Sequence, residues 1–293
     1  MSYKYIIYEK EGNIARIILN KPDMLNAMTF IGDKETAVDS GEIWAAYDEV
    51  AEDDDVKVVI IKGAGRAFCV GHDLTKVGFV YGFGTKKDDR RPSQRIRLNM
   101  DRRCVLENHM KLVLNPKITI AQIHGYASGS GAVIFMMGSD IAITSEDAKI
   151  GFSEQRLGFG GSGTTLGLLI YHVGLKRALD LVLTGRLISG EEAARIGLAT
   201  KAVPADKLEE EVEKVAQAMA LLPRDGIAIG KATRHLIYDR LGITGDFIQA
   251  YISHTMFTNL RWESDEYNFF KERRDKGARA GFHGRDERYK GLV

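Results

Sequence analysis

Two glycine-rich loops each follow a strongly apolar run, and their backbone groups could together bind a negative charge. The first loop, Ala67-Phe-Cys-Val-Gly-His-Asp-Leu74, comes shortly after Val56–Lys62, and the second, Gly125-Tyr-Ala-Ser-Gly-Ser-Gly131, directly follows Ile118–Ile123. Loops at the carboxyl ends of neighbouring parallel strands meet at one edge of a sheet. Two N–H groups converging there could stabilise a developing oxyanion, and losing one such donor costs on the order of 3 kcal/mol in barrier height. The alternative, that both are simply tight strand-to-helix turns, is equally compatible with the residues.

Other motifs that could carry chemistry are weak or missing. Leu157-Gly-Phe-Gly-Gly-Ser-Gly163 contains the spacing G-x-G-x-x-G, but a dinucleotide site needs a buried strand running directly into the first glycine. Ser153–Arg156 stand there instead, so we do not expect a nucleotide site. The chain has no G-x-S-x-G, H-E-x-x-H or C-x-x-C motif, which argues against the commonest hydrolases and metal sites. We therefore predict no metal site.

Among the seven histidines, His72 differs in placement, because it follows Gly71 beyond the carboxyl end of the predicted strand Val56–Lys62, where ligands of open α/β sheets bind. His124, His172, His235 and His254 lie in apolar or amphipathic contexts, and we expect them to be packed or surface groups.

The apolar patterning predicts an α/β architecture that positions the two loops. A hairpin is expected to open the chain, and a helix with apolar residues at helical spacing precedes the first buried strand. Continuous apolar runs indicate strands buried on both faces, as in parallel sheets. The predicted segments are the hairpin strands Tyr3–Glu9 and Ile14–Asn20, the helix Glu42–Glu52, and the strands Val56–Lys62, Ile118–Ile123 and Ile141–Thr144.

After Thr164 the pattern becomes helical. Leu208, Val212, Val215, Met219 and Leu222 form one apolar stripe between two prolines, as in an amphipathic helix. Further helices are predicted over residues 226–238 and 245–260. Because these helices follow the sheet, they cannot be its crossover connections, and we expect them to pack on its side or against a second subunit.

Composition limits the partners. Of the 293 residues 44% are hydrophobic, and 41 Lys and Arg balance 40 Asp and Glu to a net charge of +1, so we expect neither nucleic acid nor a membrane surface as a partner. Two cysteines indicate a reducing compartment, and the sequence shows neither a leader nor a membrane-length apolar run, so we predict a cytoplasmic protein. The basic segments Lys86–Arg103 and Lys271–Lys290 are interpreted as a solvated helix face and a charged tail.

Four ordered segments resemble the crotonase family, the enoyl-CoA hydratase/isomerase superfamily. They are Asn20–Ala27, Arg66–Asp73, Gly125–Gly131 and Phe152–Gly158, and Leu183–Leu198 is similar to a later family segment. The resemblance implies an α/β fold of ββα units arranged as a spiral, an acyl-CoA thioester as substrate and an oxyanion hole. It also implies a core with the active site over residues 1–203, then a C-terminal helical trimerisation region with the basic tail over residues 204–293.

By matching positions, the resemblance implies that the oxyanion hole consists of the backbone N–H groups of His72 and Ser130, the latter standing where glycine is usual. Glu154 matches a family glutamate that acts as general acid and base. A second family glutamate is replaced by Val133, and a one-residue shift would reach Ile134, which is also apolar. Asp73 is expected to brace its loop. Because the second glutamate is absent, the paired carboxylates that most strongly indicate simple hydration are missing.

Further residues are implied in binding the substrate. The coenzyme A moiety would lie along Met24–Ala27 and Arg66–Phe68, and the insert Val77–Leu114, rich in Tyr, Phe and Arg, is expected to shape the acyl pocket. Lys21 and Arg66 are candidates for phosphate contacts, with a solvated surface role as the alternative. Glu107, His109, Tyr81 or the His72 ring could replace the missing carboxylate. The predicted binding residues are Lys21, Met24, Leu25, Ala27, Arg66, Ala67, Phe68, Gly71, Asp73, Leu74, Tyr126, Gly129 and Gly131.

The leading hypothesis is an enoyl-CoA hydratase that adds water to a 2-enoyl or cyclic dienoyl thioester. A double-bond isomerase needs only one glutamate and is the first alternative, followed by a C–C hydrolase or decarboxylase of the same superfamily. A non-catalytic acyl-CoA or RNA-binding protein is also conceivable, although Glu154 argues against it. We expect coenzyme A as part of the substrate, no separate cofactor, and a homotrimer or a dimer of trimers.

Overall fold

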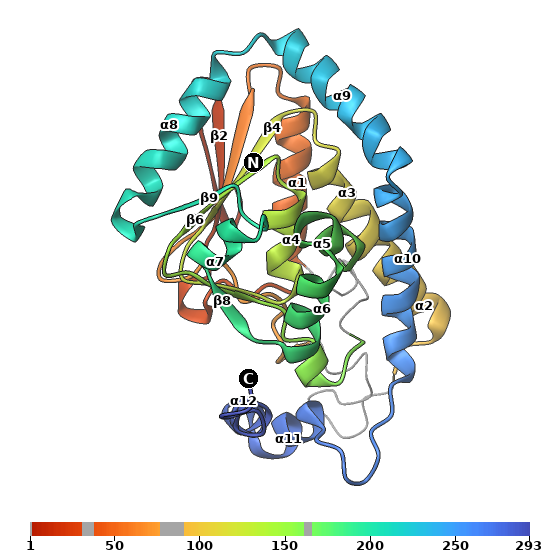
Figure 1. Ribbon diagram of the computed structural model, residues 1–293. Helices are drawn as coiled ribbons and strands as arrows, with labels where there is room; N and C mark the ends of the chain where they lie inside the picture. The colour runs from red at the N-terminus through yellow and green to blue at the C-terminus, as the bar shows by residue number, and fades with distance from the viewer. Residues whose placement is uncertain (1, 31–37, 77–90, 161–165) are drawn as a thin grey trace.

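A computed structural model describes residues 2–30, 38–76, 91–160 and 166–293 (Figure 1). Its larger sheet has the strand order β1-β2-β3-β4-β6-β9, in which only β1 and β2 pair in antiparallel fashion. This confirms the predicted opening hairpin and the parallel arrangement of the buried strands. The strands are β1 (Ile6–Glu11), β2 (Ile14–Leu19), β3 (Val58–Gly63), β4 (Ile118–Ile123), β6 (Ile141–Ser145) and β9 (Lys201–Val203).

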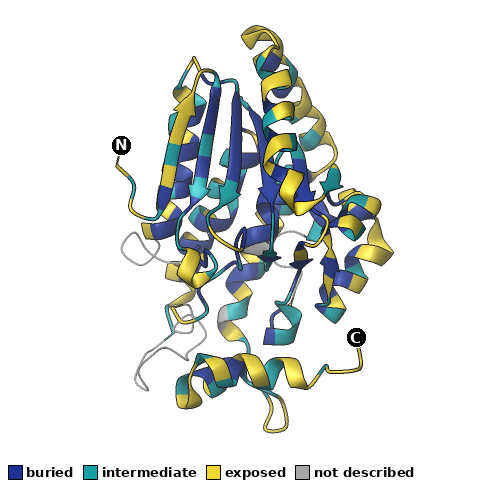
Figure 2. Ribbon diagram, turned by 90° about the vertical axis from the view of Figure 1, so that its left-hand side faces the viewer, coloured by how far each residue is buried: buried dark blue, intermediate teal, exposed yellow. Residues whose placement is uncertain are grey.

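The central strands are buried on both faces because alternate side chains meet different helices. Val58 and Ile60 of β3 pack against α8 (Leu208–Ala220), whereas Val59 and Ile61 face the core shared with α1 (Val38–Glu52) and α4 (Ser130–Gly138). Figure 2 shows these strands in dark blue, with yellow on the edge strand β1 and on the outer faces of helices. Two-sided burial explains why the apolar runs are continuous rather than alternating.

A second, three-stranded sheet lies at the end of the first and carries part of the second glycine loop. Its order is β5 (Tyr126–Ser128), β7 (Lys149–Gly151), β8 (Leu187–Ser189), with β5 and β7 parallel. Around it lie α5 (Leu166–Val173), α6 (Leu175–Thr184) and α7 (Gly190–Arg195).

The segment between β3 and β4 forms one nearly continuous helical run. It consists of α2 (Gln94–Asp101), the π-helical turn η3 (Arg102–Glu107) and α3 (Asn108–Val113). The interpretation of Lys86–Arg103 as a solvated face is wrong for Arg97, which is fully buried against α10 (Ile243–Met256). Residues 77–90 of this region lie outside the described residues.

The C-terminal region is helical, as predicted. After α8 come α9 (Arg224–Arg240) and α10, which run along one side of the molecule, then α11 (Phe269–Lys276) and α12 (Ala278–Glu287) (Figure 1). The interpretation of Lys271–Lys290 as a charged tail is wrong, because the segment forms most of α11 and all of α12, and its Arg273 is buried. Phe269 and Phe270 at the start of α11 pack in a core cluster with Met100, Leu157 and Phe159. No helix in the described part of the chain has the length and apolar character to span a bilayer.

The G-x-G-x-x-G segment is not a strand-to-helix loop. Gly158 ends the short 3₁₀ helix η4 (Gln155–Leu157) in a left-handed conformation, with φ of 88°, and it packs against the Trp262 ring. Gly163 lies outside the described residues. The expectation that no strand runs into this motif is thus confirmed.

Candidate active site

Asn26 anchors the first glycine loop to the N-terminal turn. It is fully buried and adopts a left-handed backbone with φ of 56°, a conformation that asparagine tolerates better than most residues. Its Nδ2 donates to the carbonyl oxygens of Ala64, Ala67 and Phe68 at 2.9, 2.8 and 3.1 Å. Its Oδ1 accepts the Lys21 N–H at 2.8 Å. One side chain therefore fixes the backbone that leads to Gly71.

The two glycine loops lie directly against each other. Cys69 and Ala127 form a parallel bridge, in which Cys69 N–H donates to the Tyr126 carbonyl at 3.0 Å and Ser128 N–H to the Cys69 carbonyl at 3.1 Å. Gly71 has φ of 79°, and a Cβ atom there would lie 2.6 Å from the Ser128 carbonyl oxygen. Only glycine fits this approach. The residues that follow, His72 and Ser130, are consequently held at the same junction.

The backbone N–H groups of both residues are candidates to donate to a bound group. The His72 N–H makes no hydrogen bond within the part of the chain that the structure describes. Ser130 is the first residue of α4, preceded by Gly129 with φ of 82°, so its N–H belongs to the first turn, where no intrahelical acceptor exists. The dipole of α4 adds to the attraction for negative charge there.

Glu154 reaches the same junction from a third element. It follows β7 and precedes η4, and its backbone carbonyl accepts the N–H groups of Leu157 and Phe159 at 3.0 and 3.1 Å. A Cβ atom on Gly129 would lie 3.5 Å from the Glu154 Oε1 and 3.9 Å from the Gly71 Cα. The carboxyl group of the half-buried Glu154 therefore lies beside Gly129 of the second loop, and Gly71 of the first loop lies near the same position.

The facing part of α4 supplies no second carboxylate. Val133 and Ile134 are both fully buried in the core, and the Val133 N–H donates to the Gly129 carbonyl at 3.0 Å. In the described residues no group of three or more His, Cys, Asp or Glu side chains is placed to hold a metal ion. Among the described residues, the groups proposed for chemistry at this junction are backbone donors and the Glu154 carboxyl group.

A sequence profile of the family described as Enoyl-CoA hydratase/isomerase matches residues 9–277. The chain belongs to this family. It is 30% identical over 267 residues to a probable mitochondrial enoyl-CoA hydratase of Dictyostelium discoideum, covering 91% of this chain and 87% of that protein. It is 29% identical over 215 residues to a putative enoyl-CoA hydratase of Thermus thermophilus, covering 73% of this chain and 78% of that protein.

Solved structures agree with the family's fold over nearly the whole chain. An enoyl-CoA hydratase from Mycobacterium smegmatis superposes with a TM-score of 0.81 at 26% identity, covering 99% of this chain and 95% of that one. An enoyl-CoA hydratase/isomerase from Xanthobacter autotrophicus Py2 gives 0.78 at 29% identity, covering 98% and 99%. The resemblance noted in the sequence is confirmed, and the protein is an acyl-CoA enzyme of the crotonase superfamily.

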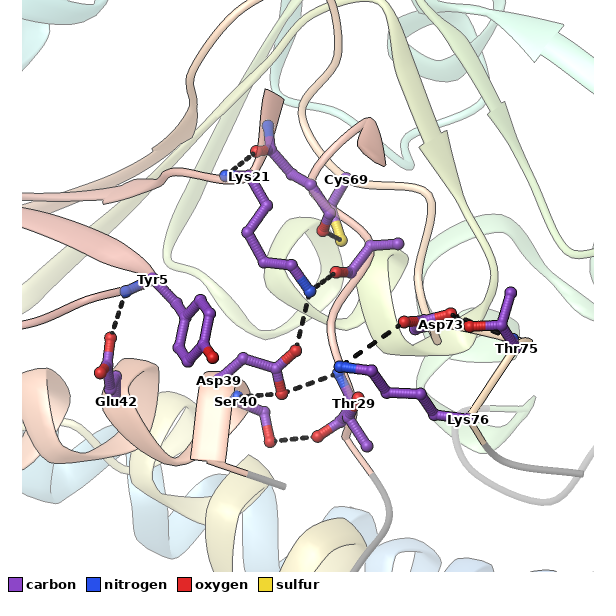
Figure 3. A network of polar contacts seen from close by, with 12 residues as sticks. Tyr5, Lys21, Thr29, Asp39, Ser40, Glu42, Cys69, Asp73, Thr75 and Lys76 are labelled. Atoms are coloured by element: carbon purple, nitrogen blue, oxygen red, sulfur yellow. Dashed lines mark hydrogen bonds and ion pairs between the residues drawn. The ribbon is translucent and has the colours of Figure 1, made fainter. Parts of the chain in front are cut away.

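The two cations expected to meet coenzyme A phosphates differ in their surroundings. The Lys21 Nζ donates to Asp39 Oδ2 at 2.9 Å and to the Ala27 carbonyl at 2.7 Å (Figure 3). Asp39 is buried and also accepts the Thr29 N–H at 3.0 Å. The Lys21 ammonium group therefore makes hydrogen bonds within the protein, whereas Arg66 is exposed beside the first glycine loop.

The remaining predicted binding residues line the loop junction or its rim. Ala27, Ala67 and Phe68 are buried, and Met24 is exposed on the N-terminal turn. The Leu25 carbonyl accepts the Val70 N–H at 3.1 Å. Tyr126 contacts Lys149, whose Nζ lies 5.1 Å from the ring centroid. Gly131 lies in the first turn of α4. The assignment of these residues to substrate binding stays a prediction.

Asp73 has the contacts expected of a brace. Its Oδ1 accepts the Thr75 N–H at 3.0 Å and the Thr75 hydroxyl at 2.5 Å, and its own N–H donates to the Met28 carbonyl at 2.9 Å. The neighbouring Leu74 carbonyl accepts a hydrogen bond from Arg273 of α11. The C-terminal region thus holds the loop that follows His72.

The residues that were candidates to replace the missing carboxylate lie in different environments. Glu107 is exposed and pairs with Arg102 at 3.1 Å, so it faces away from the core. Tyr81 lies outside the described residues. His109 is buried, and burial lowers its pKa to about 3. The His72 ring lies 5.2 Å from that of Phe30, and burial, followed by the nearby His254 and Arg97, lowers its pKa to about 3 as well.

Asn26 and Asp39 organise the site, although the sequence patterns did not predict this role for them. The only local signal was an asparagine in a turn, where that residue type favours a left-handed backbone. The buried pair Arg97 and Asp101 was not predicted either, because its i, i+4 spacing is typical of exposed helix pairs as well.

Acidification is expected to destabilise the protein. In the unfolded chain a histidine titrates near pH 6.5, whereas the folded His72 and His109 stay neutral down to about pH 3. The unfolded state alone therefore takes up protons below pH 6.5, and each residue lowers the free energy of unfolding by about 2 kcal/mol at pH 5. Urea denaturation at pH 7.5 and pH 5 measures the loss.

His109→Phe is expected to reduce this pH dependence by about 2 kcal/mol, since it removes one of the two groups. The same change at His283, whose side chain is 75% exposed, should leave it unaltered. Retention of the full pH dependence in His109→Phe would contradict the assignment.

Proposed function

We propose that this chain is an enoyl-CoA hydratase acting on a 2-enoyl or cyclic dienoyl thioester. The observation that carries the proposal is the position of the Glu154 carboxyl group, which lies beside the junction of the two glycine loops. A thioester oxygen held at that junction would place the carbons next to it near the carboxyl group. This is the arrangement that addition of water across a conjugated double bond requires.

In the proposed reaction the N–H groups of His72 and Ser130 donate to the thioester oxygen. Water adds through its oxygen to C3 while Glu154 accepts one of its protons, and the electron pair of the C2–C3 π bond moves through C2 onto the thioester oxygen. The enolate then collapses as the protonated Glu154 delivers a proton to C2. Backbone donors that are fixed before the reaction stabilise the enolate charge without reorganising.

One observation favours an isomerase as the second candidate. Val133 stands where the resemblance implies a second glutamate, and it is fully buried. A single carboxyl group suffices to remove a proton from one carbon of an enoyl thioester and return it to another. Isomerisation of a 3-enoyl to a 2-enoyl thioester would need no water at all.

Labelled water distinguishes the two candidates. The purified protein is incubated with 2-butenoyl-CoA and, separately, with 3-hexenoyl-CoA in ¹⁸O-water, and the products are analysed by mass spectrometry. Hydration predicts a 3-hydroxyacyl-CoA that carries one labelled oxygen on the acyl chain. Conversion of the 3-enoyl substrate to an unlabelled 2-enoyl product, with no labelled product from the 2-enoyl substrate, would reject hydration and support isomerisation.

We extend the proposal to the assembly and to the cofactor. Ile248, Ile252 and Met256 recur every four residues on α10 and are exposed, as are Ile229 and Leu236 on α9. An exposed apolar face of this kind suits a subunit interface, in line with a homotrimer or a dimer of trimers. The proposed chemistry uses coenzyme A as part of the substrate and needs no separate cofactor.

A further inference from the structure

A buried group of polar side chains lies between α2 and α10, which pack side by side (Figure 1). Arg97 and Asp101 are both fully buried and are joined through Nε and Oδ2 at 2.8 Å. The His254 Nδ1 lies 3.0 Å from the Arg97 Nη2 and 3.1 Å from the Asp101 Oδ1. The Thr255 hydroxyl donates to Asp101 Oδ2 at 2.9 Å. These contacts form one hydrogen-bonded network, and its charged pair, Arg97 and Asp101, has no contact with solvent.

The charges of this network act on the buried ring of His72, which packs 5.2 Å from the Phe30 ring. The electrostatic neighbours of that ring are His254, Arg97, His109 and Asp101, and we call these five residues, His72 included, the polar cluster. His72 is also the residue whose N–H donates to the thioester oxygen in the proposed function. The polar cluster therefore begins within one side chain of the proposed position of the thioester oxygen.

Two nitrogen atoms of the polar cluster lack partners. His72 Nε2 and His109 Nδ1 are buried and make no hydrogen bond within the described part of the chain. Both rings are held by aromatic neighbours. Phe30 lies 5.2 Å from His72, and Trp44 and Phe247 lie 5.9 and 6.0 Å from His109. Buried polar atoms nearly always have a partner in native proteins, so an orphan atom points to a group that is absent, such as a ligand.

The composition of the polar cluster indicates which ligand group suits it. A hydrocarbon chain gains nothing from buried charges and imidazoles, which are costly to remove from water. The Arg97 cation is already balanced by the Asp101 anion, so the polar cluster offers little net charge to a carboxylate. A neutral imidazole nitrogen, in contrast, donates or accepts a hydrogen bond according to its tautomer. This favours an uncharged oxygen.

We propose that the acyl group of the substrate carries a hydroxyl or keto oxygen beyond the double bond, and that this oxygen hydrogen-bonds within the polar cluster. The inference rests on the proposed function, because it assigns the acyl end of the same site. The proposed substrates are enoyl thioesters, linear or cyclic, whose acyl group carries this additional oxygen, rather than thioesters of plain hydrocarbon acyl groups.

The test compares acyl-CoA substrates of equal chain length. The panel holds a plain 2-enoyl-CoA, analogues with a hydroxyl or a keto group at successive carbons beyond C3, and one with a terminal carboxylate. We expect kcat/KM for the best hydroxyl or keto analogue to exceed that of the plain substrate by about 10- to 100-fold. The carboxylate analogue should show no such gain. Equal values for the plain and oxygenated substrates, or a preference for the carboxylate, would overturn the proposal.

A variant locates the preference in the polar cluster. His109→Phe keeps an aromatic ring beside Trp44 and Phe247 but removes both ring nitrogens, and we expect it to cut the preference for the oxygenated substrate by about 10-fold. The matched change His283→Phe alters an exposed ring and should leave the preference unchanged. A preference that survives intact in His109→Phe contradicts the assignment.

Binding gives a second readout that does not depend on turnover. Calorimetry measures the affinity of the native protein for saturated acyl-CoA ligands with and without the hydroxyl group. We expect the ligand with the hydroxyl group to bind more tightly. Turnover of the plain and oxygenated substrates at equal rates would reject the polar acyl group and leave the proposed function standing. Failure to bind or convert any acyl-CoA would reject both.

Discussion

Glu154→Gln is expected to lower kcat by about 10²- to 10⁴-fold, the usual contribution of a positioned general acid and base. The amide keeps the size of the side chain and its place beside Gly129, where the carboxyl oxygen lies 3.5 Å from the position of a Cβ atom, but it cannot accept and return a proton. KM should change little, because the proposed binding donors belong to the backbone of the two glycine loops. Steady-state kinetics with the substrate identified by the labelling experiment measures both constants.

Glu146→Gln is the matched control. Glu146 is an exposed acid just before β7, and the same substitution there should leave kcat unchanged. Circular dichroism and the unfolding midpoint verify that the Glu154→Gln protein is folded. A folded Glu154→Gln enzyme with the kcat of the unaltered protein would remove this residue from the mechanism, and with it the observation on which the proposed function depends.

Asn26→Asp is expected to lower the free energy of unfolding by about 3 kcal/mol or more, because three buried carbonyl oxygens lose their shared donor and face a carboxylate instead. These are the carbonyls of Ala64, Ala67 and Phe68. For a chain of this size the expected fall in Tm is about 6–12 °C. Scanning calorimetry measures it. Activity should fall as well, since the affected backbone leads directly to the His72 N–H.

Asn13→Asp provides the comparison on the surface. The Asn13 Nδ2 donates to one carbonyl, that of Asp55, at 2.6 Å in an exposed turn, so its loss should cost less than about 1 kcal/mol. If the two asparagine substitutions proved equally harmless, Asn26 would not be the anchor of the first glycine loop.

Local sequence accounts for most of the secondary structure. The run Ile118–Ile123 is buried at all six positions of β4, as a continuous apolar strand requires, and the stripe from Leu208 onward forms α8. The patterning works there because burial on two sides leaves little freedom in residue type. It fails for α11 and α12, since charge dominates Lys271–Lys290 while two phenylalanines just before that segment anchor α11 in the core.

The sequence by itself determined the family, the parallel α/β fold and the two glycine loops, because each depends on residue types at short spacing along the chain. Only the tertiary structure decided that Asn26 bonds to backbone some forty residues away, that Glu154 lies beside both glycine loops, and that Arg97, Asp101 and His254 form one buried network. These contacts join side chains far apart in sequence. Their types are common on protein surfaces, so nothing local distinguishes them until packing brings them together and excludes water.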